Sequence, residues 1–259
     1  HDVTRRVLRE AGLGGAAGRA GAVDHGAHRL CGGRHGCRTR CRLHFVAPQS
    51  SQAKVVCEYR AMARVLINHG LANRRLPDHW QRHLANALRK QGHLVSYAQF
   101  PNPEQPTLEE WQALLHAEAE LLVDAGEDAG ELIFVGHSLG CLNFLWAATS
   151  GTLPTTFDRA LLVAPADPTL LPDLEIDRLD LQNPDFASQV ARFAKRVTVV
   201  ASDKDQWIPR GVEETFGKPL GVEPVIIAGG KHLSMADGWG YWQGVIDWVN
   251  DESADLSKR

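Results

Sequence analysis

Short apolar runs alternate with longer segments of helical spacing along the chain, from residue 63 to residue 249. The short runs are rich in β-branched residues and predict strands, whereas the longer segments predict helices. The predicted strands cover residues 63–67, 93–98, 131–135, 160–164, 196–201 and 223–228. The predicted helices cover residues 78–91, 107–124, 141–148 and 239–249. This alternation predicts an α/β fold, in which helices cover both faces of a mostly parallel sheet.

The segment Gly136-His137-Ser138-Leu139-Gly140 lies between a predicted strand and a predicted helix. In this context, G-x-S-x-G is typical of a nucleophile elbow, a sharp turn that presents a serine hydroxyl at the end of a sheet. Glycine is expected at both ends, because side chains there would collide with the neighbouring strand and helix. The pentapeptide alone is equally typical of an ordinary glycine-rich turn. The interpretation of Ser138 therefore depends on partners elsewhere in the chain.

Two later loops offer the acid and the base that a serine nucleophile needs, in the chain order Ser, Asp, His. The first loop follows the strand predicted at 196–201 and contains Asp203 and Asp205. The second follows the strand predicted at 223–228 and contains His232. Open α/β sheets place their active sites at these carboxyl ends of strands. We expect Asp205, which begins a D-x-x-I-P sequence, to orient His232, and Asp203 to cap its turn.

An oxyanion hole requires two backbone N–H groups, one after the nucleophile and one in the loop after an early strand. Leu139 is the expected first donor. The strand predicted at 63–67 runs into Asn68-His69-Gly70-Leu71, so Leu71 is the expected second donor. We expect His69 and His137 to shape loops rather than carry protons, because the triad already contains one base.

Several of these segments recur together in one known family. They are residues 67–73, Pro77-Asp78-His79-Trp80, GHSLG, residues 201–205 and Gly230-Lys231-His232. Over residues 62–249 the chain resembles the retinoblastoma-binding-protein-9-like small serine hydrolases, within the α/β-hydrolase superfamily. The resemblance implies a compact α/β-hydrolase fold with little or no lid, and a triad of Ser138, Asp205 and His232. One position departs from the family, which usually has proline where this chain has His69.

The segment from Pro77 also predicts how the first helix begins. Asp78 is the expected N-cap, and Trp80, Leu84 and Leu88 follow at helical spacing. At that spacing, Trp80 is expected to belong to the core rather than to contact a ligand.

The composition agrees with one sizeable domain. Hydrophobic residues make up 44% of the chain, and no apolar run approaches the roughly 20 residues of a membrane span. Residues 167–189 are polar and predict an excursion between strands rather than a full lid. We expect a cytoplasmic location, because no signal peptide is evident and Cys141 is expected to be a buried free thiol.

Residues 1–61 differ from the rest of the chain in charge. They hold ten arginines, one lysine and four acidic residues, a net charge of +7, so residues 62–259 carry −10 of the total of −3. The acidic remainder gives no support for nucleic-acid binding, although an arginine-rich segment can bind phosphates weakly. We therefore divide the chain into an extension, 1–61, and an α/β-hydrolase domain, 62–259.

Several interpretations of the extension stay open. Zinc could bind His28, Cys31, His35, Cys37, Cys41 and His44, although their spacing matches no paired C-x-x-C pattern. A transit peptide would be arginine-rich but also serine-rich and amphipathic, which this segment is not. We favour an unstructured or non-native extension, because the segment lacks apolar periodicity and Met62 directly precedes the first predicted strand.

Together the motifs predict a hydrolase of small esters, thioesters or amides that acts through an acyl-serine intermediate. No metal or cofactor is expected, and the expected partner is a small acyl substrate, with no nucleic acid and no membrane. Two alternatives use the same fold: an acyltransferase with the same triad, and a catalytically weak protein-binding module. The complete Ser, Asp, His order disfavours the binding module, and no motif indicates a protein partner.

A chain that begins at Met62 is expected to match the full chain in melting temperature and in its rate on a short-chain chromogenic ester. A segment that buries little apolar surface cannot offset the entropy of ordering itself. Thermal melts and ester assays on both chains measure this. A melting temperature several degrees lower, or zinc bound by the longer chain alone, would contradict the prediction.

Overall fold

A computed structural model describes residues 62–126, 130–171, 174 and 179–259 of the chain. The extension 1–61, with its candidate zinc ligands, lies outside the described residues. The strands are β1 (Ala63–Asn68), β2 (Leu94–Ser96), β3 (Glu131–His137), β4 (Arg159–Val163), β5 (Val197–Ser202) and β6 (Val225–Ile227). They form one sheet in the order β2-β1-β3-β4-β5-β6, and every neighbouring pair is parallel. The predicted α/β fold is confirmed.

The two outer strands are shorter than the sequence predicts. β2 and β6 each contain three residues, whereas six were expected at each position. Both lie at an edge of the sheet, where a strand has a hydrogen-bonding neighbour on one side only. Leu94 in β2 and Ile226 in β6 are correspondingly exposed. The four central strands agree closely with the prediction, because burial on both faces makes their sequences apolar throughout.

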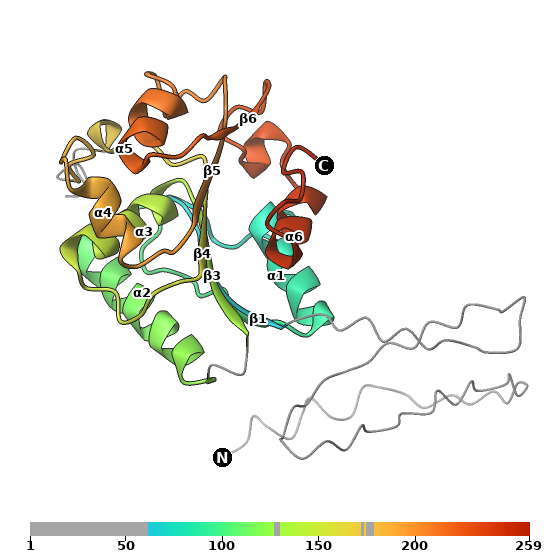
Figure 1. Cartoon of the computed structure of the whole chain (residues 1–259). Helices are drawn as coiled ribbons and strands as arrows, with labels where there is room; N and C mark the ends of the chain where they lie inside the picture. The colour runs from blue at the N-terminus through green and yellow to red at the C-terminus, as the bar shows by residue number, and fades with distance from the viewer. Residues whose placement is uncertain (1–61, 127–129, 172–173, 175–178) are drawn as a thin grey trace, which may run out of the picture. The chain divides into compact units, whose positions relative to one another are not determined.

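Helices cover the two faces of the sheet (Figure 1). One face carries α1 (Trp80–Gln91) and α6 (Gln243–Asn250), and the other carries α2 (Leu108–Val123), α3 (Leu139–Ser150), α4 (Phe186–Ala191) and α5 (Lys218–Leu220). Alternate residues of each strand therefore enter different cores. Along β3, Ile133 and Val135 pack in the core beside α1 and α6, while Leu132 and Phe134 pack in the opposite core.

The beginning of α1 differs from the prediction in its capping residue. The N-cap is His79 rather than Asp78, and His79 Nδ1 accepts the backbone N–H of Gln81 at 3.2 Å. An imidazole nitrogen replaces the usual carboxylate or hydroxyl oxygen, which sequence rules for caps do not anticipate. Trp80 is buried in the core, as expected.

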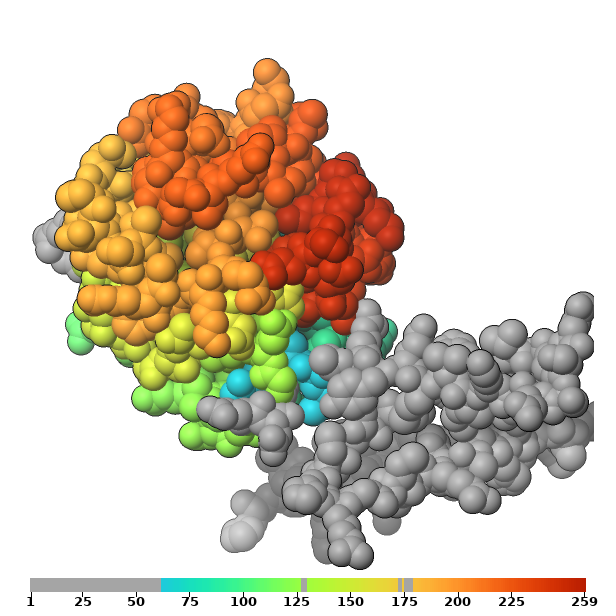
Figure 2. All heavy atoms as spheres, in the orientation of Figure 1, coloured from blue at the N-terminus to red at the C-terminus, as the bar shows by residue number. Residues whose placement is uncertain are grey.

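Two short helical segments were not predicted. One is α4, and the other is a π-helical turn, Glu213–Gly217, that continues into α5. Both are too short to show a sustained helical period in the sequence. The helix predicted at 239–249 begins only at Gln243, because Gly238 is in the left-handed region after a 3₁₀ turn, Met235–Asp237. Figure 2 shows the segments from residue 213 onward, in orange and red, across the upper and right parts of one face.

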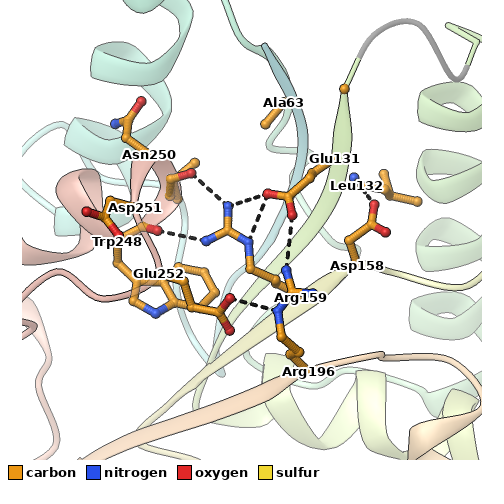
Figure 3. A network of polar contacts seen from close by, with 12 residues as sticks. Ala63, Glu131, Leu132, Asp158, Arg159, Arg196, Trp248, Asn250, Asp251 and Glu252 are labelled. Carbon is orange, nitrogen blue, oxygen red and sulfur yellow. Dashed lines mark hydrogen bonds and ion pairs between the residues drawn. The ribbon is translucent and has the colours of Figure 1, made fainter. Parts of the chain in front are cut away.

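A network of ion pairs fastens α6 to the amino-terminal ends of β3, β4 and β5 (Figure 3). The buried guanidinium of Arg159 bonds Glu131 at 2.7 Å and donates to the carbonyl oxygens of Trp248 and Val249, each at 2.9 Å. Cations stabilise the unpaired carbonyls at the end of a helix. Arg196 extends the network, since it bonds the other carboxylate oxygen of Glu131 at 3.0 Å. The carboxyl-terminal edge of the sheet carries no part of this network.

Among the described residues, no helix is both long and apolar enough to cross a membrane. Cys141 is a buried free thiol, as expected, and burial raises its pKa above the usual range. Its Sγ lies 3.5 Å from the carbonyl oxygen of Val163, so the thiol is enclosed between α3 and β4.

Candidate active site

Ser138 lies in a tight turn between β3 and α3. Its φ of 53° is in the left-handed region, which is uncommon for a residue with a side chain. An added Cβ would lie 2.8 Å from Phe134 Cε1 at Gly136, and 2.5 Å from the carbonyl oxygen of Asn68 at Gly140. The strand, turn and helix therefore approach too closely for side chains at the two glycines, which is the steric reason expected from the sequence.

Ser138, His232 and Asp205 form a continuous line of hydrogen bonds. His232 Nε2 lies 2.9 Å from Ser138 Oγ, and His232 Nδ1 lies 2.8 and 3.0 Å from the two carboxylate oxygens of Asp205. A carboxylate can only accept, so Nδ1 carries the proton and donates to Asp205. The lone pair of Nε2 then faces the serine hydroxyl, as it must if the imidazole is to accept a proton from it.

The two aspartates that follow β5 have different partners. Asp205 is buried; besides His232, it accepts the backbone N–H of Trp207 at 2.9 Å. Asp203 instead accepts the backbone N–H of Gly229 at 2.6 Å. It therefore joins the loop after β5 to the loop after β6, whereas the turn that it was expected to cap is capped by Ser202, whose Oγ accepts the N–H of Lys204 at 3.1 Å. The structure brings Asp205, and not Asp203, to His232.

The two expected oxyanion donors lie on either side of Ser138. Leu139 is the first residue of α3, where the positive end of the helix dipole lies. Leu71 follows Gly70, which packs so closely that an added Cβ would lie 3.0 Å from Ser138 Cβ. Within the described part of the chain, no group accepts a hydrogen bond from the N–H of Leu139 or of Leu71.

Three other histidines surround the site, and burial keeps them neutral. Burial lowers the pKa of His69 to about 4 and that of His79 also to about 4. Burial, and then the neighbouring His232, hold the pKa of His137 well below its usual range. His69 shapes its loop as expected, since Nδ1–H donates to the carbonyl of Gly70 and Nε2 accepts the N–H of Phe100, both at 2.9 Å.

Two hollows border the two expected oxyanion residues. A small one, with room for about 10 Å³, is lined by Leu139, Trp111 and Leu108, among others. A larger groove of about 550 Å³ is lined by Leu71, Glu104, Gln105, Pro106, Leu170, Leu171 and Leu174. The two hollows share Pro106 and Leu174. The small hollow is mainly apolar, whereas Glu104 and Gln105 add polar groups to the wall of the larger one.

The sequence did not reveal what holds the loop of His232. Trp80 Nε1–H donates to the carbonyl of Leu233 at 3.0 Å, and Trp239 Nε1–H donates to the carbonyl of Gly230 at 2.9 Å. Sequence spacing correctly placed Trp80 in the core. No local sequence pattern predicts its hydrogen bond to Leu233, which lies 153 residues further along the chain.

The fold and the line of three side chains are those of the α/β-hydrolase class, with a serine turn at the carboxyl edge of a parallel sheet. A model of the serine hydrolase family matches residues 65–251. The chain therefore belongs to the serine hydrolase family, within the α/β-hydrolase superfamily, and the resemblance found in the sequence is confirmed.

Solved structures of similar fold come from several bacteria. The ydeN gene product of B. subtilis is 24% identical, with a TM-score of 0.58 over 73% of this chain and 97% of that one. A putative yden-like hydrolase from Pectobacterium atrosepticum is 19% identical, with a TM-score of 0.53 over 73% and 90%. One structure of the metagenome-derived lipolytic enzymes LipS and LipT is 17% identical, with a TM-score of 0.51 over 67% and 86%. These similarities establish the fold. A search of curated proteins found no significant match.

No cluster of three or more His, Cys, Asp or Glu side chains among residues 62–126, 130–171, 174 and 179–259 is arranged to hold a metal ion.

The buried histidines predict that the protein becomes less stable as the pH falls from about 6.5 to 4. Their folded pKa values are depressed, so the unfolded chain binds protons that the folded chain excludes. Their contribution is complete above the unfolded pKa and is lost toward the folded pKa. Each such proton changes the free energy of unfolding by about 1.4 kcal/mol per pH unit.

Urea unfolding between pH 7.5 and 4.5 measures this slope. His79→Asn is the informative variant, because asparagine can still cap α1 but does not titrate. It is expected to flatten the slope by about one proton. An unchanged slope in this variant would show that His79 is not the neutral, buried group described above.

Proposed function

We propose that this chain is a serine esterase that cleaves a small ester, thioester or amide through an acyl-serine intermediate. Ser138 is the nucleophile, His232 the general base and acid, and Asp205 the group that orients His232. The observation that carries the proposal is the unbroken line from Asp205 through both nitrogens of His232 to Ser138 Oγ. Family membership supports the reaction class.

The first half of the reaction uses the lone pair on His232 Nε2. As Ser138 Oγ attacks the substrate carbonyl carbon, its proton passes to Nε2, and the carbonyl oxygen becomes an oxyanion. The imidazolium then returns the proton to the leaving alcohol, thiol or amine. In the second half, His232 activates a water molecule, which attacks the acyl carbon and releases Ser138. Asp205 keeps the Nδ1–H tautomer and stabilises the imidazolium.

The N–H groups of Leu139 and Leu71 are the proposed oxyanion donors. The N–H of Leu139, for which the described residues offer no acceptor, lies at the positive end of α3, so both a hydrogen bond and the helix dipole favour a developing negative charge. Gly70 allows the loop of Leu71 to lie against Ser138. Loss of one such donor typically lowers turnover by about 10²–10³.

The surroundings of the site favour substrates with an apolar acyl or alcohol group. The hollows beside Leu71 and Leu139 are lined mainly by leucine, proline and tryptophan side chains. We therefore expect short chromogenic esters to be the best first substrates. Product analysis in the presence of added alcohols separates hydrolysis from acyl transfer, because both reactions start from the same acyl-serine.

A fluorophosphonate is expected to label the wild-type protein at Ser138 and to leave Ser138→Ala unlabelled. The reagent reacts with a serine only when a base activates it. Mass spectrometry of tryptic peptides locates the label, and circular dichroism establishes that both proteins are folded. A label on another residue, or none on the folded wild type, would overturn the assignment.

Asp205→Asn is expected to lower kcat by roughly 10⁴, by analogy with the tautomer error known for other triads. The asparagine oxygen can keep the bond to Trp207 N–H, which turns the amide NH₂ toward His232 Nδ1. Asp203→Asn is the matched control, since its oxygen can still accept Gly229 N–H and it does not touch His232. Steady-state kinetics on both variants decide the point. A larger loss of kcat in Asp203→Asn than in Asp205→Asn would show that Asp205 is not the carboxylate that orients His232.

A further inference from the structure

The loop that carries His232 is held by ring N–H groups from three different places in the fold. The carbonyl oxygens of Gly230, His232 and Leu233 accept from Trp239, His137 and Trp80, in that order, at 2.9, 3.0 and 3.0 Å. Trp80 opens α1, Trp239 precedes α6, and His137 ends β3. Three of the four carbonyls from Gly230 to Leu233 are therefore fixed by a buried ring.

The loop needs such support because its backbone is strained. Lys231 has a φ of 53° and Leu233 a φ of 50°, although both carry side chains. Conformations of this kind persist only where the surrounding structure enforces them, and they concentrate at functional sites. The ring N–H bonds on either side of Lys231 supply that enforcement. His232 lies between the two strained residues, so the position of its imidazole depends on them.

His137 differs from the other two donors because it directly precedes Ser138. The Ser138 backbone is itself fixed, since its N–H donates to the carbonyl of Val163 in β4 at 3.0 Å. The ring of His137 thus joins the turn that carries the nucleophile to the residue that carries the base. We propose that His137 is a positioning residue: its Nε2–H holds the backbone of His232 at the distance at which Nε2 of His232 meets Ser138 Oγ. This proposal rests on the proposed function.

The surroundings of His137 suit a neutral donor. The rings of His232, Trp80 and His79 lie 5.2, 5.6 and 5.7 Å from its own, and His69 is also close enough to act on it electrostatically. The charged or titratable groups that act on its pKa are these histidines, and Asp205 is bonded to Nδ1 of His232. Burial and these histidines keep the pKa of His137 low. A neutral ring holds the loop without placing a second cation beside the imidazolium that forms on His232.

Two substitutions separate positioning from packing. His137→Leu keeps an apolar side chain in the core but removes the donor, whereas His137→Gln has an amide N–H at a similar reach. We expect His137→Leu to lower kcat by about 10- to 100-fold with little change in KM, because small displacements of a base are costly. His137→Gln is expected to recover most of the loss. Fluorophosphonate labelling rates should follow the same order.

Trp242→Phe is the matched control for a simple loss of stability. It removes another buried ring N–H bond, from Trp242 to the carbonyl of Leu256 at 2.8 Å. The ring of Trp242 packs against the rings of Trp80 and Trp239. Trp242→Phe is expected to lower the melting temperature about as much as His137→Leu, with kcat unchanged. Equal losses of kcat in Trp242→Phe and His137→Leu, or equal losses in the Gln and Leu variants, would overturn the proposal.

A readout without turnover keeps the test independent of the proposed function. By proton NMR, the Nδ1 proton of His232, which is bonded to Asp205, is expected to exchange faster in His137→Leu than in the wild type or in Trp242→Phe. Equal protection in all three proteins would overturn the positioning role. If the folded wild type neither cleaves esters nor reacts with a fluorophosphonate, the proposed function fails, while the NMR comparison still decides the role of His137.

Discussion

The proposed base, His232, has to reach the proposed nucleophile, Ser138, across three strand spacings of the sheet. Ser138 follows β3, whereas His232 follows β6, and β4 and β5 lie between them. At about 4.8 Å per strand, the two loops begin roughly 14 Å apart. The loop after β6 must therefore turn back over the carboxyl edge to bring Nε2 within 2.9 Å of Ser138 Oγ. Its left-handed residues, its three ring N–H donors and the Asp203 bond to Gly229 all follow from this constraint.

Electrostatics around the site follow a simple division. Asp205 is the carboxylate bonded to His232, and it is buried. His69, His79 and His137 are held neutral by burial, so they act as hydrogen-bonding groups and add no positive charge. This burial makes the fold sensitive to acid, because each buried histidine binds a proton more readily when the chain unfolds.

The two edges of the sheet carry different groups of polar residues. The amino-terminal edge carries the Arg159 network, which holds the end of α6 against β3, β4 and β5. The carboxyl-terminal edge carries Ser138, Asp205 and His232 on loops. Parallel strands make this division natural, because all their carboxyl ends meet at one edge.

Local sequence patterns predicted much of the fold and most of the candidate site residues. The apolar runs located the four central strands, and the G-x-S-x-G turn with its flanking strand and helix located Ser138. The loops after β5 and β6 supplied Asp205 and His232 as expectations that the geometry brings together. These features were accessible because each depends on residues close together in the chain.

The tertiary structure decided what depends on distant residues. His79 caps α1 in place of Asp78, Asp203 bonds the next loop, and Trp80 and His137 hold the loop of His232. The partners of Trp80 and His137 lie 153 and 95 residues along the chain. A ring N–H has no sequence signature for the carbonyl that it will meet, because that meeting exists only once the sheet has brought the loops together. The sequence thus predicted which residues carry the chemical groups of the site. The contacts that hold these groups in place form only in the folded protein.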